Sequence, residues 1–411
     1  MRFKNMPKIF QFIFFNIILF ISSTVSAQNN TISISGQLLD KETKEPIIFA
    51  SIYLKGHTIG TTSNEEGYFT FNFPSINDQN IIVISCIGYE SIEKNANNFV
   101  SNQKVFLNSK ANELDEVVIT STKKKKLTAK QIVKEAYKNI KKNYPTKPYI
   151  TEGFIRDLQN EDGKYVEYLE CAAQFYNEGY NIDKEPDVEL IEVRSNYISQ
   201  KNPWNKKWDR KNSIVDLMED DFIRFDYGPI KGKNGWKYQL EDVLLYNNKY
   251  VYKIIGTDKP FQKATLYVDT ESFAFVKLEL TRTTSNGESW KRRLSNGQKI
   301  IFYNLIIEYK EFKGKMYLKY KKEEDIWEVY DIANPNKLLF TKNPKKELFI
   351  NKIITENVQN YPFKKNMQID ISLENQAKEY NPKFWLNYNA PEKTKELSKI
   401  EQYLKKQSVI K

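Results

Sequence analysis

Short runs of alternating apolar and polar residues, separated by clusters of turn residues, occupy the chain from residue 31 to residue 85. The apolar positions of these runs are Ile32, Ile34 and Leu38; Ala50, Ile52 and Leu54; Phe69, Phe71 and Phe73; and Ile82 and Ile84. A period of two places one set of side chains on one face of a strand. With turn signals at intervals of about 8–12 residues, the pattern predicts a small antiparallel β-sandwich.

The turn residues of this stretch recur in a characteristic order. They are Gly36, Asp40, Pro46, Ala50, Gly56, Gly60-Thr61-Thr62, Glu66-Gly67-Tyr68-Phe69 and Gly88-Tyr89. This order resembles the carboxypeptidase-regulatory-like domain. The resemblance implies an Ig-like or transthyretin-like β-sandwich over residues 30–108, of a kind often fused to cell-envelope proteins of Gram-negative bacteria. Because it concerns the regulatory appendage of carboxypeptidases and not their catalytic domain, it implies a fold rather than an activity.

A second and longer series of strand patterns begins after residue 148. Strands are expected at 149–157, 165–176, 188–198, 239–246, 249–256, 264–269, 274–282, 298–312, 316–329 and 348–354. Their alternation predicts a large curved antiparallel sheet with one covered face. Two helices are expected to pack on it, at 128–141 with a capping box of Thr128 and Gln131, and at 394–405. The chain is therefore predicted to be mainly β, with a second domain over residues 128–411.

One hairpin of this second series carries another resemblance. Residues 265–280, TLYVDTESFAFVKLEL, resemble a hairpin in the lipoprotein-carrier-like half-barrels of the bacterial periplasm. In those proteins an open curved sheet folds around a helix and encloses an apolar cavity. The resemblance implies a pocket for a lipid-like ligand, and Tyr267, Phe273 and Phe275 are the residues expected to line or border it.

The first 27 residues have the pattern of an export signal. Arg2, Lys4 and Lys8 precede the apolar run Ile9–Ile21, and Val25-Ser26-Ala27 suits a signal peptidase. A membrane anchor is the alternative, but the unbroken apolar run is shorter than the roughly 20 residues that a span needs. We therefore expect residues 1–27 to be a signal peptide and the protein to be exported, to the periplasm or to the outer membrane and cell surface.

Residues 109–127 are expected to link the two domains. The segment of Leu114, Asp115, Glu116, Val117 and Val118 is similar to a stretch that follows this sandwich in outer-membrane receptors coupled to an energy-transducing periplasmic protein. A last sandwich strand or a simple connector is the favoured interpretation, and a partner-binding segment is the alternative. The run Lys123–Lys126 fits a solvated linker, with contact to an anionic membrane surface as its alternative.

The composition excludes most common active sites. The chain has a single histidine, His57, and two cysteines, Cys86 and Cys171. Zinc sites and Ser–His–Asp triads need histidines at defined positions, and the sequence contains no GxSxG, GxxxxGK[ST] or GxGxxG motif. We therefore expect no catalytic residue, no metal and no cofactor. The cysteines lie in apolar strand patterns and are expected to pack as small hydrophobes, with a disulfide between them as the alternative.

The charged residues of the chain support few specific functions, although they are numerous. A glycosidase needs only two carboxylates, so the acidic residues leave that alternative open. The tightest acidic cluster, Glu219, Asp220 and Asp221, is interpreted as a solvated face. The net charge of +11 does not indicate a nucleic-acid partner, because the lysines are dispersed and the chain is exported; it suits an anionic envelope surface.

The leading hypothesis is a non-enzymatic cell-envelope protein that binds an envelope partner or an apolar, lipid-like ligand. One alternative is a hydrolase of glycans or peptides, which requires a cleft with paired acids in the second domain. Another is an accessory of outer-membrane receptors that acts through Leu114–Thr120. The sequence specifies neither the ligand nor the oligomeric state.

Overall fold

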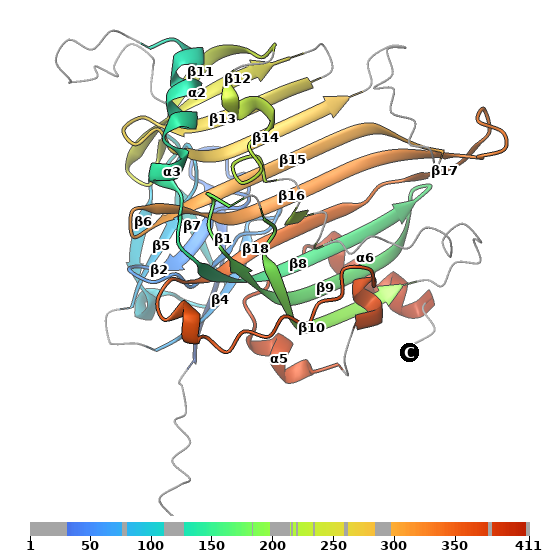
Figure 1. The fold of residues 1–411 in the computed structure, drawn as a ribbon. Helices are drawn as coiled ribbons and strands as arrows, with labels where there is room; N and C mark the ends of the chain where they lie inside the picture. The colour runs from blue at the N-terminus through green and yellow to red at the C-terminus, as the bar shows by residue number, and fades with distance from the viewer. Residues whose placement is uncertain are drawn as a thin grey trace, which may run out of the picture.

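The chain folds into a small β-sandwich and a large twisted sheet with helices packed on it (Figure 1). The computed structural model describes residues 31–75, 80–110, 127–182, 184–197, 214, 217–218, 221–232, 235–258, 262–283, 297–376 and 380–407. This is the mainly β architecture that the sequence predicts. The expected signal peptide, residues 1–27, lies outside the described residues.

The sandwich consists of two facing sheets with a continuous apolar core. One sheet has the order β4 (Tyr68–Pro74), β1 (Thr31–Asp40), β7 (Gln103–Leu107). The other has the order β3 (Gly60–Thr62), β2 (Ser51–Leu54), β5 (Ile81–Ser85), β6 (Ile92–Asn95), followed by the short helix η2 (Ala96–Asn98). Leu38, Ile52, Phe71 and Ile84 are fully buried between the sheets, which confirms the alternation read from the sequence.

The turn before β4 depends on a glycine. Gly67 has a φ of +78°, in the left-handed region that side chains disfavour. A Cβ at this position would lie 2.5 Å from the carbonyl oxygen of Leu38. Any other residue would therefore push β1 and this turn apart.

Within the described residues, eleven antiparallel strands form the large sheet. In chain order they are β8 (Tyr149–Glu161), β9 (Lys164–Asn177), β10 (Asp187–Tyr197), β11 (Lys237–Tyr246), β12 (Lys249–Thr257), β13 (Gln262–Asp269), β14 (Phe275–Thr283), β15 (Gln298–Phe312), β16 (Lys315–Tyr330), β17 (Leu338–Lys342) and β18 (Lys345–Ile354). β18 pairs with both β16 and β8, and so joins the β8–β10 hairpins to the β11–β16 meander. Every expected strand is present with its ends shifted by a few residues, and β17 is additional.

Helix α2 (Ala129–Lys138), followed by α3 (Ile140–Asn143), lies across one face of this sheet (Figure 1). The expected capping box is present, since the Thr128 and Gln131 side chains each accept a hydrogen bond from the other's backbone N–H. Ile132, Val133 and Ala136 are buried against the sheet. We call this the helix face; it carries Leu266 of β13 and Leu305 of β15, and the short helix η3 (Gly228–Lys231) also packs there.

The opposite face, here called the sandwich face, is covered by the N-terminal sandwich. The ring of Phe49 stacks on Tyr320 with centroids 4.9 Å apart. Lys319 and Lys310 donate hydrogen bonds to the carbonyls of Phe49 at 3.2 Å and Thr58 at 3.0 Å. The expectation of one covered face is therefore wrong. Long lysine side chains cover apolar surface with their stems, although an alternation pattern counts them as polar.

The C-terminal tail packs mainly on the sandwich face as well, although its Leu373 belongs to the apolar core of the helix face. It contains η4 (Val358–Asn360), η5 (Leu373–Gln376), α5 (Pro382–Asn387) and α6 (Lys395–Gln407), the last being the helix expected at 394–405. Trp385 is buried with its ring edge-on to Phe154, at 6.3 Å between centroids. The Asn389 amide bonds both the N–H and the C=O of Asn72, each at 2.8 Å. The tail thereby occupies the free edge of β4 and ties the sandwich to the sheet.

Two further expectations concern the membrane and the thiols. Among the described residues, no helix has the length and apolar character needed to cross a bilayer. Cys86 and Cys171 are both free, so the alternative of a disulfide is wrong. Burial raises the pKa of Cys86 to about 11, as expected for a packed and unreactive thiol.

Candidate functional site

A cavity of about 40 Å³ lies on the helix face, between the large sheet and the chain around residues 217–224. Its apolar walls come from Phe175, Leu217, Met218, Leu318, Leu348 and Ile350. A water molecule needs roughly 10–15 Å³ of such space. The cavity is therefore large enough for a few water molecules or for the end of a larger molecule.

Arg224 lines this cavity and is only 7% exposed. Its guanidinium donates to Asn177 Oδ1 at 2.9 Å, to the Tyr149 hydroxyl at 3.3 Å and to two backbone carbonyls. It also stacks on the ring of Tyr180 at 4.6 Å from the centroid. Burial by itself lowers the pKa of Arg224, but the neighbouring Tyr149, Tyr180 and Asp221 raise it above its usual value. The side chain is therefore a fixed buried cation.

Two more charged side chains line the cavity. Asp221, 6% exposed, accepts hydrogen bonds from the Tyr309 hydroxyl at 2.8 Å and from the backbone N–H of Arg224 at 3.3 Å. Lys321, 1% exposed, donates to the carbonyl of Leu217 at 2.5 Å. An otherwise apolar cavity thus contains charges held in defined positions.

The hydroxyl of Tyr180 is also buried at this cavity. It makes no hydrogen bond of good geometry in the part of the chain that the structure describes, although it lies close enough to the Tyr149 hydroxyl to lower the pKa of Tyr149. Burial raises the pKa of Tyr180 well above its usual value of 10, so the O–H remains available for donation. Leaving a buried donor without an acceptor costs about 1–3 kcal/mol, so an acceptor placed here gains a hydrogen bond that the protein alone does not make.

A pair of acids follows Lys321 along β16. Glu323 and Asp325 are spaced at intervals of two and therefore share the helix face with Lys321. Glu323 Oε2 and Asp325 Oδ1 are buried with no hydrogen-bond partner among the described residues. Burial, and then the charge of Glu323, raise the pKa of Asp325 to about 8, so Asp325 is mostly neutral at pH 7. Neither acid lines the cavity.

The acids present no metal site. Within the described ranges, no group of three or more histidine, cysteine, aspartate or glutamate side chains is placed to hold a metal ion. Paired acids are nevertheless the feature that the hydrolase alternative requires. Glu323 and Asp325 are therefore the residues on which that alternative should be tested.

The residues expected from the hairpin resemblance lie elsewhere on the sheet. Phe275 is fully buried on the helix face, where its carbonyl accepts from the Tyr144 hydroxyl at 2.7 Å. Tyr267 pairs with Lys277 and points to the sandwich face. Phe273 occupies the turn between the two strands with a φ of 58°. None of the three lines the cavity described above, and a pocket formed by them stays a prediction.

The other singled-out segments have different outcomes. Leu114–Val118, Glu219 and Asp220 lie outside the described residues. Asp221 is not part of a solvated face as expected, because the Tyr309 hydroxyl and backbone N–H groups stabilise it in a buried position. The sequence does contain a local sign that Asp221 is buried. Asp221 and Arg224 flank two large apolar residues, Phe222 and Ile223, which pack into the core.

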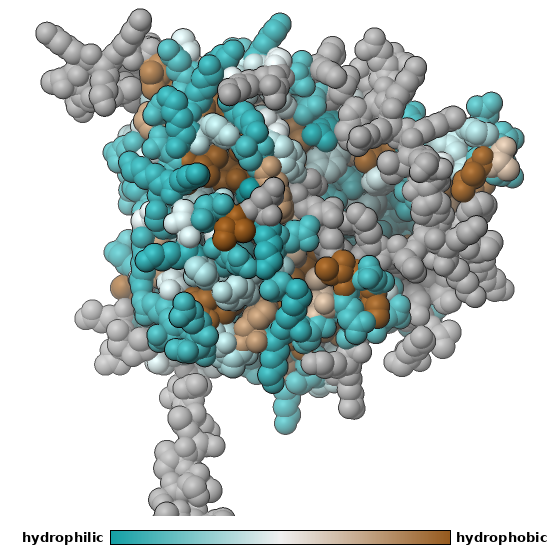
Figure 2. Space-filling view, in the orientation of Figure 1, coloured by the Kyte–Doolittle hydropathy of each residue, from teal (hydrophilic) through white to brown (hydrophobic). Residues whose placement is uncertain are grey.

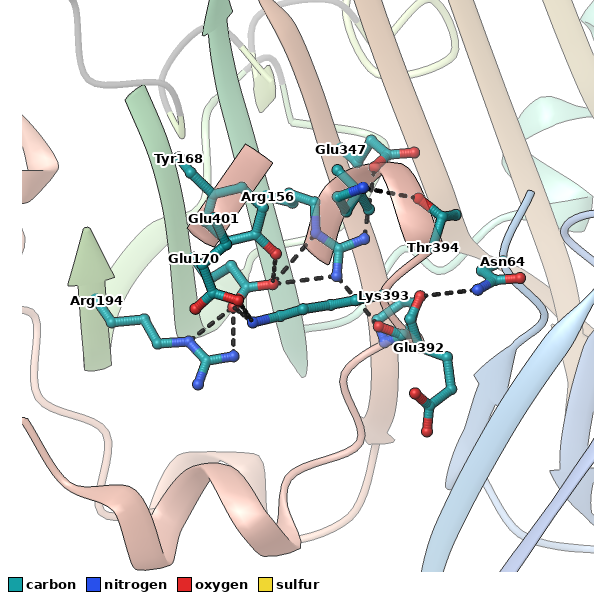
Figure 3. Close-up of polar contacts among 12 residues, drawn as sticks. Asn64, Arg156, Tyr168, Glu170, Arg194, Glu347, Glu392, Lys393, Thr394 and Glu401 are labelled. Carbon is teal, nitrogen blue, oxygen red and sulfur yellow. Dashed lines mark hydrogen bonds and ion pairs between the residues drawn. The ribbon is translucent and has the colours of Figure 1, made fainter. Parts of the chain in front are cut away.

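A second buried charge cluster lies on the sandwich face beneath the tail (Figure 3). The carboxylate of Glu170, fully buried in β9, accepts hydrogen bonds from Arg156 at 3.1 Å, Arg194 at 2.7 Å and Tyr168 at 2.6 Å. Burial raises the pKa of Glu170, but Arg156, Lys393 and Arg194 outweigh it and lower this pKa to about 2. Arg156 also donates to the carbonyl of Pro391 at 3.1 Å. This cluster joins three strands to the tail.

The exposed surface offers no comparable site on the side that Figure 2 shows. There, apolar residues form separate small patches among hydrophilic ones. Scattered exposed apolar residues are normal for folded proteins. Among the described residues of that side, those that line the cavity are therefore a better candidate than the exposed apolar patches.

Residues 34–119 match the family model of the CarboxypepD_reg-like domain. The resemblance read from the turn residues is thereby confirmed, and the match extends across Leu114–Val118. No curated protein matches the chain.

Several solved structures are similar to just over half of the chain. A LolA superfamily protein from Nitrosomonas europaea is 12% identical, with a TM-score of 0.22, covering 58% of this chain and 99% of that one. A DUF1329 family protein from Desulfovibrio piger is 10% identical, with a TM-score of 0.26 and coverages of 56% and 95%. A putative outer membrane lipoprotein-sorting protein domain from Vibrio parahaemolyticus is 11% identical, with a TM-score of 0.25 and coverages of 56% and 94%. At such TM-scores the likeness carries no argument about function.

Proposed function

We propose that this chain is a non-enzymatic, exported cell-envelope protein that binds a small apolar or amphiphilic molecule in the cavity on the helix face. The cavity itself is the observation that supports this most directly. It combines apolar walls at Leu318, Leu348 and Ile350 with the fixed charge of Arg224. Binding pockets for small molecules typically have this combination, in which apolar surface gives affinity and a few polar groups give orientation.

Export and envelope location are supported by two features of the N-terminal part. Residues 1–27 have the pattern of a signal peptide. The sandwich matches the CarboxypepD_reg-like domain family. Its histidine, His57, lies in a turn of the sandwich, and we propose no catalytic role for it. In this proposal the sandwich stabilises the sheet from the sandwich face and leaves the helix face to the ligand.

The proposal is tested by native mass spectrometry of the mature chain, purified gently from the envelope. The expected result is a small-molecule adduct on the wild-type chain. Leu318→Trp should remove it, because Leu318 is half-buried at the cavity and a larger side chain fills the space. Leu338→Trp is the matched control, since Leu338 is exposed on β17 and lies outside the cavity lining. Thermal unfolding confirms that both variants fold.

Two results would contradict the proposal. An adduct that persists in a folded Leu318→Trp variant would place the ligand elsewhere. A bare wild-type mass with a stoichiometric protein partner would indicate a docking module instead. The non-enzymatic part is tested separately by a turnover screen on glycans and peptides, in which activity abolished by Glu323→Gln would show it to be wrong.

A further inference from the structure

Arg224 is a buried cation whose direct partners are all neutral. Its guanidinium bonds the Asn177 amide oxygen, the Tyr149 hydroxyl and backbone carbonyls, and it forms no ion pair with any described residue. Asp221 acts on it through space, but that carboxylate accepts hydrogen bonds from Tyr309 and from backbone N–H groups. Buried charges in proteins are normally paired with an opposite charge. At this cavity wall, a negative partner of Arg224 is missing.

Tyr180 gives a second and independent indication at the same wall. Its ring stacks under the guanidinium of Arg224, and its hydroxyl is a buried donor whose contact with the Tyr149 hydroxyl lacks good hydrogen-bond geometry in the described chain. A carboxylate has two oxygens that accept hydrogen bonds and a negative charge. One such group would supply both the negative charge that Arg224 does not pair with and a better acceptor for Tyr180 than the Tyr149 hydroxyl.

We propose that the cavity binds the carboxylate group of an amphiphile, held by the charge of Arg224 and by a hydrogen bond from Tyr180. The apolar part of the ligand then lies against Leu318, Leu348 and Ile350. This inference rests on the proposed function and adds the ligand class, a molecule with a carboxylate head and an apolar chain. The cavity of about 40 Å³ suits a carboxylate head group and the first carbons of the chain, and it is partly open, so that the rest of the chain can extend out of it.

The test compares two ligands that differ only in their head group. Dodecanoate and dodecanol, both kept below the concentrations at which they aggregate, are titrated into the delipidated full-length mature chain by calorimetry. We expect the wild type to bind dodecanoate at least about tenfold more tightly than dodecanol, because only the carboxylate carries the negative charge that pairs with Arg224. Leu318→Trp should weaken both ligands, since it fills the apolar part of the site.

The variant that isolates the head group is Tyr180→Phe. It should weaken dodecanoate about tenfold and dodecanol less, because a hydrogen bond to a carboxylate is stronger than one to a neutral hydroxyl oxygen. Tyr403→Phe is the matched control, since Tyr403 is exposed on α6, away from the cavity. This control should bind both ligands as the wild type does.

The outcomes separate the inference from the proposed function. Equal affinity of the wild type for dodecanoate and dodecanol, or a folded Tyr180→Phe variant that keeps the full preference for dodecanoate, would overturn the carboxylate site and leave the cavity as a binding site. Binding of neither ligand, together with a bare mass of the protein isolated from the envelope, would overturn both.

Discussion

Two buried arginines on opposite faces of one sheet have different surroundings. On the sandwich face, Arg156 pairs with Glu170 and lies 3.9 Å from Glu347, and the tail closes over it. On the helix face, Arg224 has neutral partners and borders a cavity. Burial alone therefore does not distinguish a structural charge from a functional one. The distinction lies in whether the protein supplies the opposite charge itself.

The acids of the two faces show the same contrast. Glu170 is surrounded by cations, which lower its pKa to about 2. Asp325 is buried beside another acid, and its pKa is raised to about 8. Desolvation raises the pKa of both, and the sign of the net shift is set by the neighbouring charges. The sandwich face thus holds an ionised acid within a completed network, whereas the helix face holds a neutral one.

The largest effect is expected from Glu170→Gln. Removing this carboxylate takes away the buried partner of Arg194 and the nearer of the two carboxylates that pair with Arg156, and breaking a buried pair typically costs about 3–5 kcal/mol. Urea unfolding at pH 7 measures the loss. The control is Glu93→Gln, which removes the exposed pair with Lys55 and should change stability by less than about 0.5 kcal/mol.

The same variant makes a prediction about acid unfolding. The pKa of Glu170 falls from 4.5 to about 2 on folding, so its contribution to stability is complete above pH 4.5 and is lost as the pH falls towards 2. The wild type should therefore lose stability over this window more steeply than Glu170→Gln. Parallel pH curves, or a loss below about 1 kcal/mol at pH 7, would mean that the cluster is not the joint inferred here.

The opposite sign is expected for Asp325→Asn. The pKa of Asp325 rises from 3.8 to about 8 on folding, so the native state binds its proton more tightly, and this contribution to stability decreases as the pH rises between those values. Asparagine does not ionise, so the variant should exceed the wild type by at least about 1 kcal/mol at pH 8, since each pKa unit corresponds to about 1.4 kcal/mol. At pH 4 the difference should be small.

Urea unfolding at pH 4, 6 and 8 measures this difference. Asp370→Asn is the control, because Asp370 is exposed. A wild type as stable as Asp325→Asn at all three pH values would show that Asp325 is ionised in the folded protein. The two faces would then not differ in the charge state of their acids.

The sequence predicted the elements of both domains because local rules determine them. Phe69, Phe71 and Phe73 alternate with polar residues and are all buried in the sandwich core. Thr128 and Gln131 form the capping box that starts α2. Each of these features depends on residues within a few positions of one another, and the pattern therefore contains the information.

The candidate site could not be predicted in this way. Tyr180, Arg224 and Lys321 come from distant parts of the chain and meet only when β18 joins the two groups of strands. The expectation for Tyr267 came from the hairpin resemblance, and the strand register turns this side chain towards the sandwich face, away from the cavity described here. The alternation pattern of a strand does not show which face of the sheet the sandwich covers, because that depends on tertiary packing.

The smallest effect, and the sharpest test of the comparison, is expected from Tyr180→Phe, which is compared with Tyr309→Phe in the delipidated protein. Tyr309→Phe removes a hydrogen bond of 2.8 Å to the Asp221 carboxylate and should cost about 1.5–3 kcal/mol. Tyr180→Phe removes a hydroxyl that makes no hydrogen bond of good geometry with a described residue, and should change stability by less than about 0.5 kcal/mol. Urea unfolding of both variants measures the difference.

With dodecanoate bound, the loss of unfolding free energy caused by Tyr180→Phe should increase, whereas the loss caused by Tyr309→Phe should not, because only the Tyr180 hydroxyl then gains a carboxylate acceptor. Equal costs in the ligand-free protein would mean that the Tyr180 hydroxyl is already satisfied, and that the helix face is as complete as the sandwich face.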